Sequence, residues 1–141
     1  MDLKDSVAVV TGASKGIGRA IALSLAQAGV NVVLASRSSE LLSMTQKEII
    51  ESGGKAVSIP TDVTSDNSVR NLIIETQKRF NSIDILINNA GVGIFSNVID
   101  MKTDEYEAMM NVNLKGVFLC SRAVLPAMMR QRWKQCLTNA S

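Results

Sequence analysis

Histidine is absent from the 141 residues of this chain. Its absence excludes a histidine-based catalytic triad and every metal site that needs an imidazole, and it weighs against zinc. Cysteine is scarce too, since Cys120 and Cys136 lie far apart and outside any CxxC pattern. That spacing favours two reduced thiols in an intracellular protein over a redox or metal-binding role. We therefore expect no metal site.

The chain also has no large excess of positive or negative charge. Lysine and arginine number 15 against 13 acidic residues, which gives no electrostatic basis for a nucleic-acid or membrane partner. The first residues, including Asp2, Lys4 and Asp5, do not resemble a signal peptide, and no apolar stretch is long enough to span a bilayer. The sequence thus predicts a soluble, cytoplasmic protein that binds neither nucleic acid nor a membrane.

What the sequence does contain is a regular alternation of two kinds of apolar segment. Short β-branched runs predict strands over residues 7–10, 30–35, 56–59 and 83–87. Apolar residues at helical spacing predict helices over residues 17–28, 39–52, 66–80 and 103 to about 130, the last interrupted near Asn113. Apolar strands that alternate with helices are typical of a parallel sheet covered on both faces. We expect one doubly wound α/β domain over residues 1–141, or the first part of one.

The last residues, 134–141, lie where a fifth strand is due. They contain few of the large apolar side chains that a central buried strand needs. Pairing with the sheet and exclusion from it are equally compatible with this composition. The sheet is therefore expected to be incomplete, with four or five strands.

A glycine-rich segment, Thr11-Gly12-Ala13-Ser14-Lys15-Gly16-Ile17-Gly18, joins the first predicted strand to the first helix. Gly12 allows a sharp turn, Gly16 lets the backbone approach a phosphate, and Gly18 lets helix and strand pack closely. The helix N-terminus beyond offers free N–H groups and a partial positive charge. The strand before and the helix after favour a nucleotide-binding turn over a purely structural one. The segment lacks the terminal Gly-Lys-Ser/Thr of a P-loop, which excludes that class of ATPase.

The residue after the second predicted strand bears on the choice of dinucleotide. An NAD site needs a carboxylate there to bind the ribose hydroxyls, but this chain has Ser36-Arg37. A guanidinium at this place pairs with a 2′-phosphate, and Lys15 offers a second positive charge. The alternative is that Arg37 is a solvated surface residue. Its position favours NADP(H) over NAD(H).

Four segments, considered together, identify a family. They are Thr11-Gly12-(x)3-Gly16-Ile17-Gly18, Asp62-Val63, Asn88-Asn89-Ala90-Gly91 and Asn113-Leu114-(x)-Gly116. In this order they resemble the motifs of the short-chain dehydrogenase/reductase family, and the run over about residues 5–133 is most similar to 3-oxoacyl-[acyl-carrier-protein] reductases. The resemblance implies a Rossmann-type fold. It also implies an oxidoreductase that moves hydride between NADP(H) and a carbonyl or secondary alcohol, including an acyl thioester substrate.

The resemblance also implies roles for single residues. The pyrophosphate and adenosine ribose would be bound by Gly12, Ser14, Lys15, Gly16, Ile17 and Gly18. Asp62 would accept from the adenine amino group, with Val63 lining that pocket, while Asn89, Ala90 and Gly91 would close the sheet end beside the cofactor. Asn113 would be catalytic, breaking its helix so that exposed backbone holds a water. Without the resemblance, these three segments indicate only a strand-to-helix turn, a hydrogen-bonded turn and a helix break.

The remaining catalytic groups of the family are a serine and a Tyr-(x)3-Lys pair. Counting from Asn113 places the serine on Ser141, the last residue, and no Tyr-(x)3-Lys follows. Tyr106 precedes Asn113 and is not followed by lysine at the fourth position. We therefore expect no appreciable turnover from this chain alone. A non-catalytic dinucleotide-binding module and a truncated product are the alternatives to an enzyme.

The long last helix carries two further expectations. In the family this helix helps to form an oligomer interface, so the full-length protein is expected to be a homo-oligomer. The contact is expected at a stripe of Leu119, Ala123 and Ala127. Four methionines, Met109, Met110, Met128 and Met129, are expected to pack in the core and in that interface.

Overall fold

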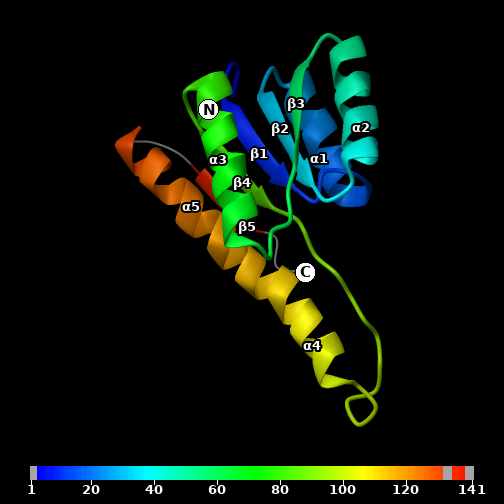
Figure 1. The fold of residues 1–141 in the computed structure, drawn as a ribbon. Coiled ribbons are helices and arrows are strands. Elements are labelled where there is room, and N and C mark those ends of the chain that lie inside the picture. The colour runs from blue at the N-terminus through cyan, green and yellow to red at the C-terminus, as the bar shows by residue number, and fades with distance from the viewer. Residues whose placement is uncertain (1–2, 132–134, 139–141) are drawn as a thin grey trace.

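The computed structural model describes residues 3–131 and 135–138. Strands and helices alternate along the chain (Figure 1). The elements are β1 (Val7–Thr11), α1 (Gly16–Gln27), β2 (Asn31–Ser36), α2 (Ser39–Glu51), β3 (Lys55–Pro60), α3 (Asp66–Phe80), β4 (Ile85–Asn88), α4 (Thr103–Met110), η1 (Asn111–Lys115), α5 (Gly116–Arg130) and β5 (Gln135–Thr138). The predicted elements are confirmed, and the ends of the first seven differ from the prediction by at most two residues.

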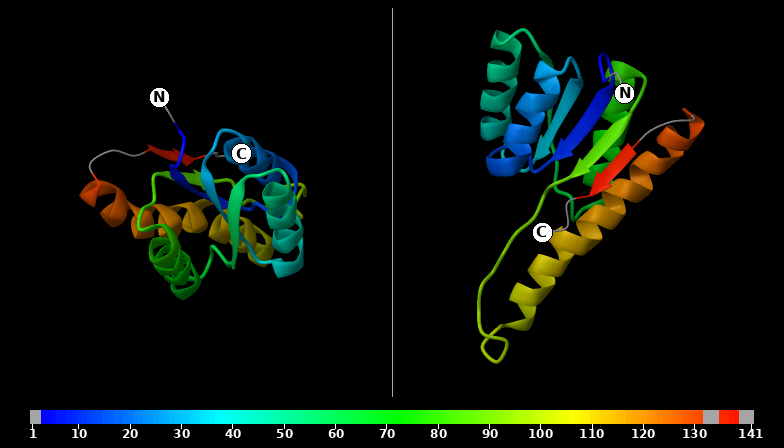
Figure 2. Two further views of the ribbon diagram at one scale, coloured as in Figure 1. Left: turned by 90° about the horizontal axis from the view of Figure 1, so that it is seen from above. Right: turned by 180° about the vertical axis from the view of Figure 1, so that it is seen from behind.

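The strands form one parallel sheet in the order β3-β2-β1-β4-β5. Helices α1 and α2 cover one face, and α3 and α5 cover the other (Figure 2). Val9 packs into the layer under α3 and α5, whereas Val10 packs into the layer under α1 and α2. Because β1 is buried on both faces, its sequence is an unbroken apolar run. The predicted doubly wound α/β sheet is confirmed.

The carboxyl-terminal segment provides the fifth strand that the composition left undecided. Gln135–Thr138 pairs in parallel with β4, in a register that sets Leu86 opposite Cys136. Parallel pairing is made by backbone N–H and C=O groups, so it needs no particular side chain. The other residues of the 134–141 stretch, Ser141 among them, lie outside the described residues.

Strand β4 begins two residues later than predicted, because Asp84 uses its side chain at that point. Its carboxylate Oδ2 accepts a hydrogen bond from the Val7 N–H at 2.7 Å, and its own N–H donates to the Val7 carbonyl at 2.8 Å. Asp84 is buried. The carboxylate thus pairs a backbone N–H at the start of β1 that would otherwise be buried without an acceptor.

The long helix is interrupted where the sequence predicted. Residues Asn111–Lys115 form a π-turn between α4 and α5. Helix α5 lies on the sheet, whereas α4 extends beyond it with the segment that follows β4 beside it (Figure 1). We call residues 91–110 the projecting arm. Helix α4 has no buried residue, so it adds no side chain to the buried core.

Among residues 3–131 and 135–138, one helix is long and apolar enough to cross a membrane, by length and composition only. This is the continuous run Thr103–Arg130, of 28 residues, with a mean hydropathy of 1.2 over a window that is one-third buried. The expectation that no stretch is long enough was therefore wrong. Within this run Leu119, Cys120 and Val124 pack into the core beneath the sheet, which accounts for much of its apolar character.

Replacing the buried carboxylate at the start of β4 tests its role. Asp84→Ala leaves the Val7 N–H without this acceptor and should lower the free energy of unfolding by about 1–3 kcal/mol. Asp84→Asn keeps an acceptor oxygen and should lose less. Urea unfolding followed by circular dichroism measures both variants. An alanine variant as stable as the parent chain would contradict the assignment.

Candidate functional site

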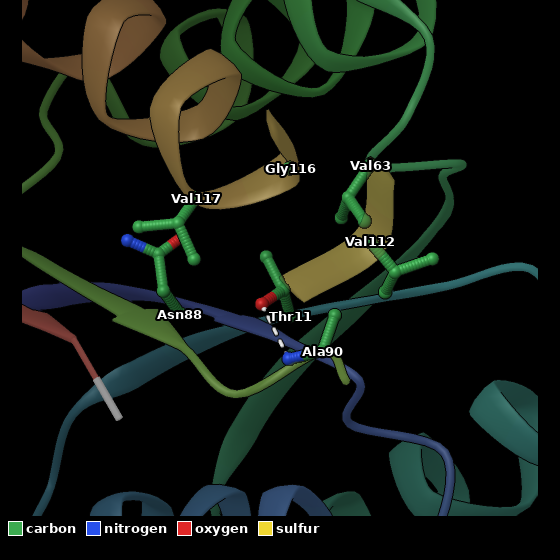
Figure 3. Close-up of a pocket in the computed structure, with 7 residues that line it drawn as sticks. All are labelled: Thr11, Val63, Asn88, Ala90, Val112, Gly116 and Val117. Atoms are coloured by element: carbon green, nitrogen blue, oxygen red, sulfur yellow. Dashed lines mark hydrogen bonds between the residues drawn. The ribbon is translucent and has the colours of Figure 1, made fainter. Parts of the chain in front are cut away.

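The carboxyl ends of β1 and β4 are joined by the buried hydroxyl of Thr11. Its Oγ1 donates to the carbonyl of Ile87 at 3.2 Å and accepts from the N–H groups of Asn89 and Ala90, both at 3.0 Å. Figure 3 shows the bond to Ala90. No role was predicted for Thr11 from the sequence. The signal that could have found it is a hydroxyl at the buried end of an apolar strand, since a buried polar group needs partners.

Asn89 closes the same corner from the other side. Its Nδ2 donates to the carbonyls of Thr11 and Gly12 at 3.1 and 3.3 Å. The amide therefore binds the backbone at the point where β1 turns into the glycine-rich segment. Gly91, two residues further on, is exposed at the base of the projecting arm.

The glycines between β1 and α1 meet three different needs. Gly12 and Gly16 have φ of 65° and 57°, a region that side chains disfavour. A Cβ on Gly12 would lie 2.8 Å from Asn89 Nδ2, and one on Gly18 would overlap the same amide and the Gly12 carbonyl. A Cβ on Gly16 would meet nothing within 4 Å. The turn and the close packing of helix on strand are as predicted, while Gly16 faces open space.

The N-terminus of α1 is uncapped and open. Lys15 at the cap position makes no side-chain hydrogen bond to the first turn, and that turn has no acidic residue. Ser14 is half-buried, Lys15 is exposed, and the apolar Ile17 is 70% exposed. The first N–H groups of a helix carry a partial positive charge and need acceptors. This end of α1 therefore offers an anion both donors and a favourable potential.

Arg37 and Asp62 follow β2 and β3 at the same edge of the sheet. Asp62 Oδ1 accepts from the N–H and the hydroxyl of Thr64, at 2.9 and 2.8 Å. These two bonds, with smaller contributions from the charges of Arg37 and Lys115, hold the pKa of Asp62 below its usual value against a smaller opposing effect of burial. No donor among the described residues binds Asp62 Oδ2. Asp62 is therefore an ionised acceptor with one oxygen available, and the buried Val63 lies beside it.

Asn113 lies in the π-turn and holds the base of the projecting arm. Its Oδ1 accepts from the Val92 N–H at 2.9 Å, and its Nδ2 donates to the Val92 carbonyl at 2.8 Å. Met109, one turn earlier, accepts from the Ile94 N–H through its sulfur at 3.3 Å. The amide thus does more than break a helix, because it fixes the chain that leaves β4.

A hollow of about 140 Å³ lies between the ends of β1 and β4 and the start of α5. Its lining, drawn in Figure 3, consists of Thr11, Val63, Asn88, Ala90, Val112, Gly116 and Val117. The enclosed part of this hollow has no room for even one water molecule, whereas a typical ligand pocket measures about 300 Å³ or more. A dinucleotide would therefore have to lie along the open edge of the sheet.

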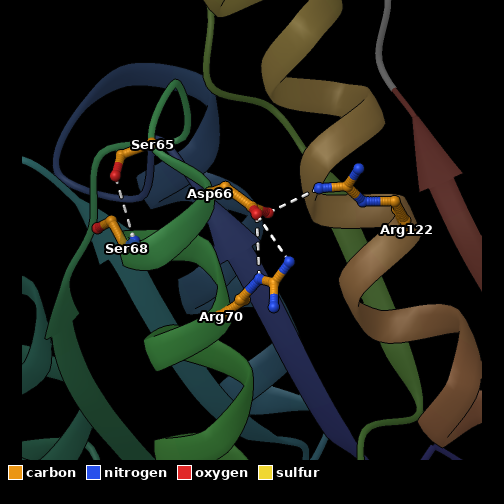
Figure 4. A network of polar contacts seen from close by, with 5 residues as sticks. All are labelled: Ser65, Asp66, Ser68, Arg70 and Arg122. Atoms are coloured by element: carbon orange, nitrogen blue, oxygen red, sulfur yellow. Dashed lines mark hydrogen bonds and ion pairs between the residues drawn. The ribbon is translucent and has the colours of Figure 1, made fainter.

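An ion-pair network fixes α5 against α3 (Figure 4). Asp66, in the first turn of α3, binds Arg70 at 2.9 Å and Arg122 of α5 at 2.7 Å. The Arg122 guanidinium also lies 4.9 Å from the centre of the Phe118 ring. Ser65 caps the same helix through the Ser68 N–H at 3.3 Å. These contacts hold the helix whose N-terminal end follows Asn113.

The predicted contact stripe on the long helix was wrong. Leu119 and Ala127 are 4% and 2% exposed, because they face the core of this chain, and Ala123 packs against that core. The exposed apolar side chains of the helix are Tyr106, Met110, Leu114, Phe118, Leu125 and Met129. The core position expected for Met128 is confirmed. Met110 and Met129 are exposed, and Met109 contacts the arm.

Two glycine substitutions separate close packing from backbone strain. Gly18→Ala should destabilise the fold by more than about 2 kcal/mol, because its methyl overlaps backbone and the Asn89 amide. Gly16→Ala should cost only about 1–2 kcal/mol, the penalty of a positive φ, because nothing lies near its methyl. Thermal unfolding of the two variants makes the comparison. Equal losses would contradict the assigned packing role of Gly18.

Comparison with known proteins places the chain among oxidoreductases. The family model described as short chain dehydrogenase matches residues 6–140. A 3-oxoacyl-[acyl-carrier-protein] reductase of Synechocystis sp. is 41% identical over 131 residues, which are 92% of this chain and 53% of that protein. An uncharacterized oxidoreductase of Staphylococcus aureus strain USA300 is 43% identical over 139 residues, 99% of this chain and 59% of that protein. The chain thus spans a little over half the length of these relatives.

Solved structures agree on the fold. A short-chain type dehydrogenase/reductase from Mycobacterium marinum superposes with a TM-score of 0.94 at 37% identity, covering 97% of this chain and 56% of that one. A metagenomic short-chain oxidoreductase in complex with NADP gives a TM-score of 0.93 at 38% identity, covering 98% and 63%. With the ordered motifs and the parallel sheet, these matches establish that the chain belongs to the short-chain dehydrogenase/reductase family of oxidoreductases.

Proposed function

We propose that this chain is the dinucleotide-binding part of an NADP(H)-dependent short-chain dehydrogenase/reductase. The observation that carries the proposal is the uncapped N-terminus of α1, which opens at the carboxyl ends of the parallel strands. Ligands of open α/β sheets bind at this edge, where the strand order reverses. Here the reversal lies between β1 and β4, because β2 and β3 continue on one side of β1 and β4 and β5 on the other.

The pyrophosphate is assigned to the turn before α1. The residues proposed to bind it are Gly12, Ser14, Lys15, Gly16, Ile17 and Gly18, through backbone N–H groups and through the side-chain hydroxyl of Ser14 and ammonium of Lys15. Gly16 has open space where a side chain would stand, which leaves room for a phosphate. Ile17 is an exposed apolar side chain, and a bound ligand would cover it. The residues present therefore fit a dinucleotide.

The adenosine end is assigned to Arg37, Asp62 and Val63. Arg37 would bind the 2′-phosphate, and Asp62 Oδ2 would accept from the adenine amino group over Val63. A family neighbour was solved with NADP, and an alcohol dehydrogenase from Thermococcus sibiricus was solved with 5-hydroxy-NADP. These structures support NADP(H) as the first choice and NAD(H) as the second. Asn89, Ala90 and Gly91 would line the nicotinamide end.

Bound nicotinamide supplies hydride chemistry between its ring and a carbonyl or secondary alcohol carbon. This chain would contribute Asn113, which fixes the base of the projecting arm beside Asn89 and Gly91, and Ser141 as a hydrogen-bond donor to the substrate oxygen. A 3-oxoacyl thioester is the proposed substrate, by similarity to the Synechocystis reductase. The only tyrosine of the chain, Tyr106, lies before Asn113 and on exposed α4. We therefore assign these 141 residues dinucleotide binding without appreciable turnover.

A second copy of the chain is the proposed partner of the exposed stripe Tyr106, Met110, Leu114, Phe118, Leu125 and Met129. Acidic residues stand at the α4 end of this helix (Asp104, Glu105 and Glu107), and basic residues stand from its middle to its α5 end (Lys115, Arg122 and Arg130). Two such helices packed antiparallel would oppose unlike charges and cover both stripes. A stripe covered in this way fits a cytoplasmic homo-oligomer.

Removing the guanidinium tests the cofactor assignment. Arg37→Ala should weaken NADPH binding by about 10- to 100-fold, since a hydrogen bond to a charged group contributes about 1.5–3 kcal/mol. NADH binding should change by less than about threefold, because NADH has no 2′-phosphate. Fluorescence titration measures both, with a turnover assay alongside. The control is Arg79→Ala, because Arg79 is an exposed arginine in the last turn of α3, away from the assigned site. Equal losses for both dinucleotides, or measurable reduction of a ketone, would contradict the proposal.

A charge placed in the exposed stripe tests the partner. Leu114→Glu should shift the chain from dimer to monomer, because a buried carboxylate would have to be desolvated in the contact. Ile74→Glu changes an exposed apolar residue of α3 and should leave the dimer intact. Sedimentation equilibrium of the three proteins decides the question. A monomeric parent chain would refute this contact.

A further inference from the structure

Gly116, the first residue of α5, is in tight contact with the segment that follows β3. A Cβ built on it would lie 2.9 Å from Val63 Cγ2, 3.2 Å from Val63 Cβ and 3.5 Å from the Val63 carbonyl. Gly116 is not in a positive-φ conformation, so backbone strain does not require a glycine there. Position 116 requires glycine because there is no room for a side chain. Figure 3 shows Val63 beside this part of the helix.

Val63 has little freedom to move away from the helix. Before it, the Thr61 N–H donates to the Ser36 carbonyl at 2.8 Å and the Asp62 N–H donates to Ser68 Oγ at 3.0 Å. After it, the Thr64 N–H and hydroxyl are bound to Asp62 Oδ1. A methyl group on Gly116 would therefore displace either the start of α5 or this whole turn.

The start of α5, on the other side of the contact, is also held by hydrogen bonds of the neighbouring residues. Gly116 directly follows the π-turn in which Asn113 binds both backbone groups of Val92. Val112, in the same turn, lines the hollow with Gly116 and Val63. The contact thus joins the base of the projecting arm to the turn that carries Asp62. The same placement brings the charge of Lys115 close enough to act on Asp62.

We propose that Gly116 is a positioning residue of the dinucleotide site. The absence of a side chain seats α5 on Val63 and thereby sets where the free Asp62 oxygen stands to accept from the cofactor's purine. This inference rests on the proposed function, because it assumes that the Asp62 turn receives the adenine. It assigns Gly116 a steric role at the adenosine end and none in the chemistry of hydride transfer.

The experiment compares Gly116→Ala, Val63→Ala and the double variant. Alanine favours a helix more than glycine does, so in open space Gly116→Ala would raise the melting temperature. The tight contact should instead lower it. The dissociation constant for 2′,5′-ADP, which has the adenosine end alone, should rise at least tenfold. The constant for NADPH should rise by the same factor, because both ligands share that end.

Removing the valine methyls tests the contact itself. Val63→Ala deletes Cγ2, the nearest atom to the added methyl, so the double variant should recover most of the lost affinity and melting temperature. Val69→Ala is the matched control, since Val69 is also a buried valine of the same core, but none of its atoms is among those closest to a Cβ on Gly116. Combined with Gly116→Ala, it should rescue neither property.

The outcomes separate the two ideas. Loss of affinity in Gly116→Ala with rescue by Val63→Ala supports the inference. A parent chain that binds 2′,5′-ADP, with a Gly116→Ala variant that binds it equally well, overturns the inference and leaves the proposed function standing. Rescue by Val69→Ala as readily as by Val63→Ala also overturns it. A folded parent chain that binds neither 2′,5′-ADP nor NADPH overturns both.

Discussion

The structure depends on the parallel pairing of β1 with β4 and on its closure at one corner. Thr11 and Asn89 exchange five hydrogen bonds with the ends of these two strands, through one hydroxyl and one amide. The glycine-rich turn before α1 and the segment that begins at Asn89 both leave the sheet at this corner. Because the Thr11 hydroxyl is buried and binds three backbone groups, the turns that leave this corner have few alternative directions.

The glycine-rich turn was predictable, because the conformation of the turn depends on residues that are close together in the sequence. Positive φ at Gly12 and Gly16 and the lack of room at Gly18 are properties of single backbone positions. Thr11 was missed because its partners, Ile87, Asn89 and Ala90, lie 76 to 79 residues along the chain. A strand-end hydroxyl gives no sign, in sequence alone, of which distant backbone it will bind.

The undecided fifth strand and the wrong contact stripe also have physical causes. Composition left β5 undecided because a parallel ladder is made by backbone groups, and composition describes side chains. The stripe of Leu119, Ala123 and Ala127 was assigned to the wrong face because helical periodicity defines faces without saying which one meets the sheet. Val63 and Gly116 lie far apart in sequence, so their contact also required the fold.

The π-turn has a geometric effect on the exposed face of the long helix. Residues four apart in an α-helix are separated by about 400° of rotation, so a stripe with that spacing drifts by about 40° at each step. Three such steps lead from Tyr106 through Met110 and Leu114 to Phe118, a drift of about 120°. The i→i+5 turn of Asn111–Lys115 takes up one extra residue, about 100°, and nearly cancels that drift. The four side chains therefore keep one heading along the helix, and without the extra residue of this turn they would spiral around it.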